Sequence, residues 1–176
     1  LAVALLVLDS VAIQKVYAAH VCRVRTWEVF VLRGASYLPQ LLNYHLGQAW
    51  MTWFVSRVYS APLARVAGAT LLVYGTMFGG LCLLGCGSLV LEPAASSWLG
   101  PVLAVLGVVA AGYGLLLLWQ PATLRRFPTA DLLLDAGVSG HAMALIWRLP
   151  HVLTLFLGMW LPFSFFGVTI PLSDAL

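Results

Sequence analysis

The stretch VAGATLLVYGTMFGGLCLLGCGSLVL, residues 66–91, decides the fold. It contains no charged side chain, and it exceeds the roughly 20 apolar residues that a helix needs to cross a bilayer. The whole chain agrees, since 62% of its residues are hydrophobic and 9% charged, against about 45–50% and about 25% in soluble domains. We therefore expect an integral membrane protein. The nine Lys and Arg residues are scattered along the chain, so no nucleic-acid partner is expected.

Three further segments outside this span have the length and composition of membrane helices. Residues 98–119 form a second clean span, and residues 139–162 form a third that carries polar groups in its first half. Residues 1–20 almost qualify, but Asp9 and Lys15 interrupt them, so this helix must turn one face toward protein or water. The pattern predicts an all-α, polytopic protein with about four spanning helices.

The basic residues predict how these spans are oriented. Arginines lie in three connections, and the loop 92–97 and the segment 163–172 contain no basic residue. Since cytoplasmic loops carry an excess of Lys and Arg, the three arginine-bearing connections are predicted to be inside and the other two segments outside. These arginines are Arg23, Arg25, Arg57, Arg65, Arg125 and Arg126.

This orientation constrains residues 26–61, because the chain must enter and leave the membrane on the same side. Two full spans would need about 40 residues plus a turn, and this segment offers only about 30, or roughly 20 Å for each leg. We therefore predict a re-entrant helical hairpin over about residues 27–57. Its legs would be about Trp27–Leu42, loosened by Pro39, and Gln48–Arg57, with the turn over Asn43–Gly47.

The predicted turn is unusually polar for a membrane segment. Backbone groups exposed at membrane depth are tolerated only when protein or a wet cavity satisfies them. Asn43, His45 and Gln48 can supply such partners, which gives these side chains a capping role. The alternative is that the same turn lines a pathway for a polar group. Both interpretations stay open at this point.

Ionisable residues inside the apolar segments are the next candidates for function, because charges in a membrane usually mark pathways or pairs. Asp9 and Lys15 are six residues apart and do not face each other on one helix, so each needs a partner elsewhere. Arg33 and Arg148 lie at no obvious membrane boundary, and His151 follows Arg148 closely. Arginine binds phosphate bidentately, which would suit an anionic lipid head group.

A catalytic set is not evident. No Ser/His/Asp spacing can be defended, and no cofactor motif is present. Asp131 and Asp135 are four residues apart on one helix face, but the leucines between them indicate a short interfacial amphipathic helix rather than a metal site. We expect neither metal nor cofactor, and no enzymatic activity is assigned.

The segment RGASYLPQLLNYHLGQAWMTWFVSR, residues 33–57, followed by a long glycine-rich span, resembles the transmembrane, flippase-like domain of lysylphosphatidylglycerol synthases. The matching positions are Asn43, Gly47 and Arg57, and the closing stretch from Arg148 onward is similar to a downstream helix of that family. The family's turn usually reads Pro-Gly, whereas this chain has His45-Leu46-Gly47. The family's soluble aminoacyl-transferase domain has no counterpart here, so that activity is not transferred.

The resemblance implies a protein that binds or translocates a phospholipid, anionic or aminoacylated, in the plasma (inner) membrane of a prokaryote. The expected head-group site comprises Arg33, Asn43, His45, Gly47, Gln48 and Arg57, and the expected intramembrane polar partners are Asp9, Lys15, Arg148 and His151. A membrane enzyme acting on a lipid-linked substrate and a structural assembly subunit are the alternatives.

The chain ends suggest how it fits a larger protein. The sequence begins at Leu1 in an apolar run and ends at Ser173-Asp174, which reads as the start of another helix. We therefore expect residues 1–176 to be one integral membrane domain within a longer one. Membrane lipids are the expected partners, and a homo-oligomer is left open.

Overall fold

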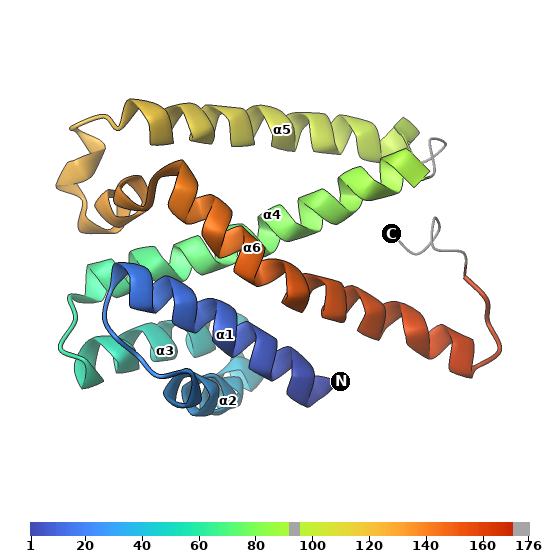
Figure 1. The fold of residues 1–176 in the computed structure, drawn as a ribbon, viewed down its shortest axis with the longest axis horizontal. Helices are drawn as coiled ribbons and strands as arrows, with labels where there is room; N and C mark the ends of the chain where they lie inside the picture. Colours follow the sequence, from blue (N-terminus) through green and yellow to red (C-terminus); the bar gives the residue numbers. More distant parts are fainter. Residues whose placement is uncertain (92–95, 171–176) are drawn as a thin grey trace.

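The computed structural model, which describes residues 1–91 and 96–170, is a bundle of α-helices (Figure 1). No strand occurs in those ranges, and the predicted all-α class is confirmed. The predicted loop 92–97 and the predicted helix start at Ser173 lie wholly or mostly outside the described residues. The elements are α1 (Ala2–His20), α2 (Thr26–Leu42), α3 (Tyr44–Val58), α4 (Leu63–Leu91), α5 (Ser96–Trp119), the 3-10 turn η2 (Leu124–Arg126) and α6 (Pro128–Phe165).

Four helices are long and apolar enough to cross a membrane, namely α1, α4, α5 and α6. They correspond to the four predicted spans. The largest difference concerns α6, which starts at Pro128, well before the predicted start at residue 139. Gly137, with φ 57° and ψ −173°, breaks the helical geometry and separates a short first arm from the long apolar part. Glycine suits this position because a side chain there would strain the left-handed backbone.

The first arm of α6, residues 128–136, carries the two aspartates of the predicted amphipathic helix. The Arg125 guanidinium donates from Nη1 to Asp131 at 3.1 Å and to Asp135 at 2.9 Å. These carboxylates, Asp135 first, raise the pKa of Arg125. The two aspartates therefore anchor the connection between α5 and α6 by an ion pair.

Helices α2 and α3 form the predicted hairpin, and neither is long and apolar enough to count as a span. The predicted turn over Asn43–Gly47 is wrong in its length, because α3 already starts at Tyr44. Only Asn43 is non-helical, with an extended backbone at φ −160° and ψ 133°. Its Oδ1 accepts the His45 N–H at 2.8 Å and caps α3. One capping residue is enough to reverse the chain, because it satisfies a backbone donor that the helix start leaves free.

Gly47 explains how the two legs of the hairpin lie so close. A Cβ at this position would be 2.1 Å from Gln40 Cγ and 2.6 Å from the Ser36 carbonyl oxygen. No side chain fits against backbone at that distance, so only glycine allows α2 and α3 to pack here. In membrane helices, small residues permit such close approach where lipid provides no hydrophobic drive.

The three arginine-bearing connections gather at one end of the bundle, on the left of Figure 1, which we call the basic end. Hydrogen bonds tie these connections together there. Arg65 donates from Nε to the His20 carbonyl at 2.8 Å, and Thr129 donates to the Ala64 carbonyl at 3.2 Å. The gathering agrees with the predicted orientation, which places all three connections on the cytoplasmic side.

The tip of the hairpin points away from the basic end and stops partway along α4. The ring of Tyr44, the first residue of α3, lies 6.1 Å from the ring of Tyr74. Tyr74 is 11 residues into the 29-residue α4, which places it about 17 Å along a helix of about 44 Å. The hairpin therefore turns near mid-depth, as the re-entrant prediction requires.

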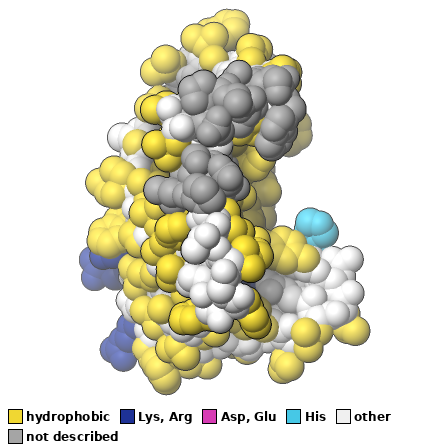
Figure 2. All heavy atoms as spheres, turned by 90° about the vertical axis from the view of Figure 1, so that its right-hand side faces the viewer, with side chains coloured by type: hydrophobic (Ala, Val, Ile, Leu, Met, Phe, Trp, Pro, Cys, Tyr) yellow, Lys and Arg dark blue, Asp and Glu magenta, His cyan; other side chains and the backbone are white. Residues whose placement is uncertain are grey.

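The core lies where α1 packs against the hairpin, α4 and α6. Its residues come mainly from these five helices and include Ile13, Val16, Tyr17, Val29, Met51, Val55, Val66, Leu72 and Leu132. Large apolar side chains remain exposed outside this core. Such apolar surface along the flanks of spanning helices is suited to contact with lipid. Figure 2 looks along the helices onto the end opposite the basic end, where no acidic side chain is seen among the coloured atoms.

Candidate functional site

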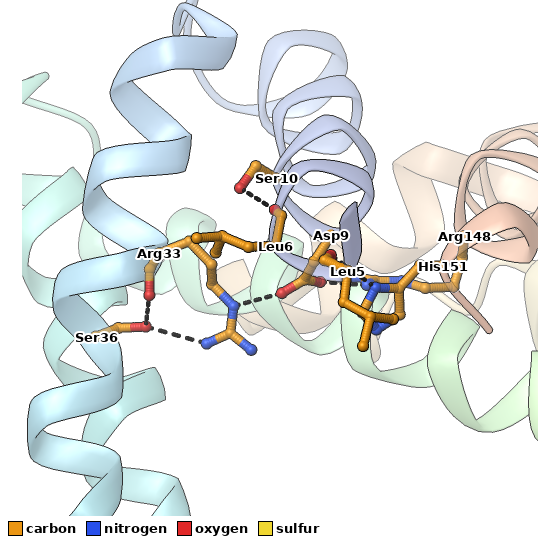
Figure 3. A network of polar contacts seen from close by, with 8 residues as sticks. All are labelled: Leu5, Leu6, Asp9, Ser10, Arg33, Ser36, Arg148 and His151. Carbon is orange, nitrogen blue, oxygen red and sulfur yellow. Dashed lines mark hydrogen bonds and ion pairs between the residues drawn. The ribbon is translucent and has the colours of Figure 1, made fainter. Parts of the chain in front are cut away.

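A cluster of three charged side chains is buried among α1, α2 and α6 (Figure 3). Asp9 lies between Arg33 and Arg148, and each arginine donates to a different oxygen of its carboxylate. Arg33 uses Nε toward Oδ2, whereas Arg148 uses Nη1 toward Oδ1. We call these three residues the charge cluster. Each comes from a different helix, so the cluster links all three.

Neighbouring groups hold the arginines in place. Arg33 Nη1 donates to Ser36 Oγ at 3.0 Å, and the Ser36 hydroxyl donates to the Arg33 carbonyl at 2.7 Å. The guanidinium of Arg33 also lies 5.1 Å from the ring centroid of Tyr37, a cation–π distance. His151, one helical turn from Arg148, has its Nδ1 3.1 Å from the Leu5 carbonyl oxygen.

The charges of the cluster do not balance. One carboxylate faces two guanidinium groups, which leaves a formal charge of +1 (Asp9 −1, Arg33 +1, Arg148 +1). Arg148 is only 3% exposed, and its Nε has no hydrogen-bond partner. A buried charge without a partner is costly, so an excess of this kind favours binding of an anion.

The cluster lies deep within the helices that would cross the membrane. Asp9 is 11 residues from the end of α1 at His20, and Arg148 is 11 residues beyond Gly137. Both separations correspond to about 17 Å along a helix, a little more than half of a hydrocarbon core of about 30 Å. The unbalanced positive charge therefore lies at mid-depth.

A second, uncharged network lies between α1, α3 and α4. The Tyr17 hydroxyl is 2.9 Å from Thr70 Oγ1, which is 3.0 Å from Thr52 Oγ1. Thr70 also donates to the Val66 carbonyl at 2.9 Å. All three hydroxyls are buried and paired, so this network fixes helix packing and offers no free group to a ligand.

The predicted head-group residues are distributed over the whole hairpin. Arg33 belongs to the charge cluster, whereas Asn43 and His45 lie exposed at the tip. Arg57 is exposed near the basic end, 14 residues or about 21 Å along α3 from Asn43. The structure therefore separates Arg57 from Asn43 and brings Arg33 to Asp9 and Arg148.

Gln48 is the most unusual of the predicted residues. Its side chain is 7% exposed, and neither its Oε1 nor its Nε2 has a hydrogen-bond partner. Gln40 Nε2, on the facing helix α2, is buried and unpartnered as well. Gln48 and Gly47 are adjacent buried positions of α3, and Gly47 packs against Gln40. An unpaired buried amide costs free energy, so these groups lie where a polar partner would stabilise them.

Among the predicted polar partners, Asp9, Arg148 and His151 lie together, whereas Lys15 is elsewhere. The Lys15 ammonium lies 4.7 Å from the centroid of the Trp147 ring, on the outer surface. Sequence reasoning did not predict the contributions of Ser36 and Tyr37. Their spacing of three and four residues from Arg33 places them on its helix face, which is the signal that could have indicated them.

The fold and the charge cluster together define a multi-pass helical membrane protein. No family model, curated protein or solved structure compared with the chain matches it significantly. In the described ranges, no group of three His, Cys, Asp or Glu residues is arranged to hold a metal ion.

Proposed function

We propose that this protein is a flippase-like membrane protein that binds a phospholipid head group and translocates it across the bilayer. The charge cluster supports this proposal most strongly. It contains one more guanidinium group than carboxylates, and it lies at mid-depth among spanning helices. The resemblance of residues 33–57 to the transmembrane domain of lysylphosphatidylglycerol synthases leads to the same class of function.

The proposed substrate follows from the charge balance. A phosphodiester carries one negative charge, which would neutralise the formal +1 of the cluster. Arginine binds phosphate through two parallel N–H donors, and Arg148 Nε is a donor without a partner. Asp9 holds Arg33 and Arg148 near each other despite their like charges, because each guanidinium group pairs with one oxygen of its carboxylate. In the proposed mechanism the acyl chains remain in lipid while the head group passes the cluster.

The hairpin contributes Arg33 from a segment that does not cross the membrane. The tip of the hairpin stops near Tyr74, partway along α4. Helices α2 and α3 therefore do not extend through the leaflet opposite the basic end, and they do not separate that leaflet from the cluster. The unpaired amides of Gln40 and Gln48 lie on this same hairpin. They are candidate partners for the polar part of a head group on its way past the tip.

Reconstitution in vesicles tests this proposal. The purified protein would be inserted into liposomes that contain a fluorescent phosphatidylglycerol, and translocation would be followed by chemical quenching of the outer leaflet. Arg33→Lys and Arg148→Lys retain the charge but lose the bidentate geometry. We expect each to slow translocation about tenfold, which corresponds to about 1.4 kcal/mol in the barrier. Arg57→Lys, at an exposed position, is the matched control and should keep the wild-type rate.

Three outcomes would contradict the assignment. If the folded Arg33→Lys and Arg148→Lys proteins translocate lipid at the wild-type rate, the cluster is not the head-group site. If Asn43→Ala or Arg57→Ala abolishes translocation instead, the site lies along the hairpin surface as the sequence predicted. If the wild-type protein moves no lipid while Asp9→Ala unfolds it, the cluster serves only to hold α1, α2 and α6 together.

A further inference from the structure

A groove of about 430 Å³ runs along the outer surface of the bundle between α1 and α6. Exposed side chains line both of its sides, Lys15 and Ala19 from α1 and Ser139, Met143 and Trp147 from α6. The three residues from α6 are spaced four apart, so they form one row about 12 Å long. That length equals a little more than two turns of a helix.

The groove extends from the basic end into the bundle. At the basic end His20 packs against Gly140, where an added Cβ would lie 3.3 Å from His20 Cε1. Arg65 donates to the His20 carbonyl, so this contact lies at the level of the arginines. Counted from the contact, Lys15 is five positions along α1 and Trp147 is seven positions along α6. These two side chains therefore meet about 8–10 Å further into the bundle, at the deep end of the groove.

The ammonium of Lys15 lies below the membrane surface. It is 4.7 Å from the centroid of the Trp147 ring, and Trp147 directly precedes Arg148 of the charge cluster. Lysines near the ends of spanning helices usually extend their ammonium to the interface. Lys15 instead holds its ammonium against an aromatic ring within the groove, about 8–10 Å from the level of the arginines at the basic end.

The positive charge of Lys15 is not neutralised by the protein. No carboxylate forms an ion pair with Lys15 in the part of the chain that the structure describes. Asp9 is the one acidic residue in α1, α4, α5 and the part of α6 after Gly137, and both of its oxygens bind the arginines of the charge cluster. The contact with Trp147 stabilises the ammonium without neutralising it. Charges within a membrane are costly alone and pair with one another.

We infer that this groove is a docking site for a transmembrane helix of a partner protein, and that an Asp or Glu of this helix pairs with the Lys15 ammonium. The shape of the groove fits such an occupant. Ala19, Ser139 and Gly140 give it small side chains between its deep end and the basic end, and small residues let helix backbones approach closely in a membrane. The row along α6 is long enough to contact two turns of the docked helix.

The depth of the ammonium determines which anion can reach it. A lipid phosphate lies in the head-group region, outside the hydrocarbon core, whereas a spanning helix can carry a carboxylate at any depth. A second copy of this chain is also unsuitable, because the acidic residue of its spanning segments, Asp9, is buried in its own charge cluster. The occupant is therefore a helix of a different protein.

The docking site shares no side chain with the charge cluster. Trp147 and Arg148 are adjacent in α6, but Trp147 is exposed whereas Arg148 is buried. The groove thus lies on the outer side of the contact between α1 and α6, and the pair of Asp9 and Arg148 lies on its inner side. The inference does not depend on lipid translocation.

Cross-linking to designed helices tests the inference. The protein with Ala19→Cys would be placed in phosphatidylcholine vesicles with a leucine–alanine transmembrane peptide that carries one Glu and, one helical turn away, one cysteine. In a glutathione redox buffer the cross-linked fraction reports association at equilibrium, and the chain without Ala19→Cys gives the background of Cys22, Cys82 and Cys86. We expect the Glu peptide to associate about tenfold more tightly than the same peptide with Gln, which corresponds to about 1.4 kcal/mol.

Substitution of Lys15 should change this preference in a defined way. Lys15→Gln should remove the preference for the Glu peptide, and Lys15→Glu should replace it with a preference for a peptide that carries Lys. Arg126→Gln is the matched control, because it removes one positive charge from an exposed residue at the basic end and should keep the preference. Each result is a ratio of two peptides on one protein, so a smaller folded fraction does not imitate it.

Four outcomes would overturn the inference. The first is equal association of the Glu and Gln peptides with the protein that retains Lys15. The second is a preference that persists in Lys15→Gln or is lost equally in Arg126→Gln. The third is loss of the preference when phosphatidylglycerol is added to the vesicles, which would make a lipid the occupant. The fourth is cross-linking of the introduced cysteine to a second copy of the chain in place of the peptide.

Discussion

The charge cluster and α5 show two ways in which a helix can belong to this bundle. Helices α1, α2 and α6 meet through buried ion pairs. In contrast, α5 is apolar on all sides, and Leu117 is its only buried residue among those described. Among its described side chains, one hydrogen bond, between Tyr113 and His141 at 2.8 Å, joins the helix itself to α6. Its glycines Gly107, Gly112 and Gly114 face open space.

The difference teaches that polarity, rather than hydrophobicity, determines which helices of this protein pack tightly. An apolar side chain gains little when it leaves lipid for protein, because both surroundings are apolar. Polar pairs and close glycine contacts have no equivalent in lipid, and they hold helices at defined positions. Changes in the charge cluster, the hairpin and the hydroxyl network should therefore cost stability, whereas similar changes in α5 should not.

Asp9→Ala should have the largest effect on stability. It leaves Arg33 and Arg148 buried without their shared carboxylate, and removal of one partner from a buried ion pair costs about 3–5 kcal/mol. The free energy of unfolding in mixed micelles would measure the loss. Val108→Ala on the exposed surface of α5 is the control and should change this free energy by less than about 0.5 kcal/mol. Equal effects of the two substitutions would contradict the comparison.

Gly47→Ala should have the second-largest effect and lower the free energy of unfolding by about 1–3 kcal/mol. The added methyl group collides with the Ser36 carbonyl and forces α2 and α3 apart. Disulfide cross-linking between cysteines introduced in the two legs would report the separation, and thermal unfolding in detergent would report the stability. Gly112→Ala in α5 meets no atom within 4 Å and should cost nothing. Unchanged cross-linking and stability in Gly47→Ala would show that the hairpin does not need its close contact.

Thr70→Val should cost about 0.6–1.7 kcal/mol, the range measured for hydrogen bonds between membrane helices. The substitution keeps the shape of the side chain but removes the hydroxyl that contacts both Tyr17 and Thr52. A double-mutant cycle with Tyr17→Phe would isolate the pair. Thr154→Val is the control, because the Thr154 hydroxyl bonds only the Pro150 carbonyl of its own helix. A coupling energy of zero would mean that the network does not hold α1 to α4.

Asn43→Ala should have the smallest effect, about 0.5 kcal/mol at the exposed tip, since it removes the side chain that caps α3. Asn43→Asp restores an acceptor for the His45 N–H and should recover the loss. Hydrogen exchange of the backbone amides at residues 44–46 is the most direct measurement. Faster exchange in both variants would contradict the capping role.

Much of the fold was predictable from the sequence, because membrane spans depend on local composition. The four spans and the hairpin between Arg25 and Arg57 follow from apolar length and the positions of the arginines. The exact turn was not predictable. Gly47, next to polar residues, indicated a loop, but its role is to let two helices meet. The start of α6 was missed because a glycine kink continues the helix at an angle instead of ending it.

The candidate site was predictable only in part. Charged residues in apolar helices require partners, which singled out Asp9, Arg33 and Arg148. Their pairing joins residues 24 and 139 positions apart, and a single sequence contains no signal for such distant contacts. The sequence does not distinguish the position of Arg57 from that of Arg33, since both are arginines of the same hairpin. Only the packing of α2 against α1 shows that Arg33 faces inward and Arg57 does not.

The lengths of α4 and α6 have a consequence for the membrane itself. Helix α4 has 29 residues, and the apolar part of α6 after Gly137 has 28, so each is about 42–44 Å long. The two helices cross near their middle (Figure 1), and they share the most extensive helix contact in the bundle. Helices longer than the local hydrocarbon thickness tilt or thicken the bilayer, at a cost of fractions of a kcal/mol for each Å. Each of the two helices therefore exceeds a hydrocarbon core of about 30 Å by roughly 13 Å, and a tilt of both helices in the bilayer accommodates the excess.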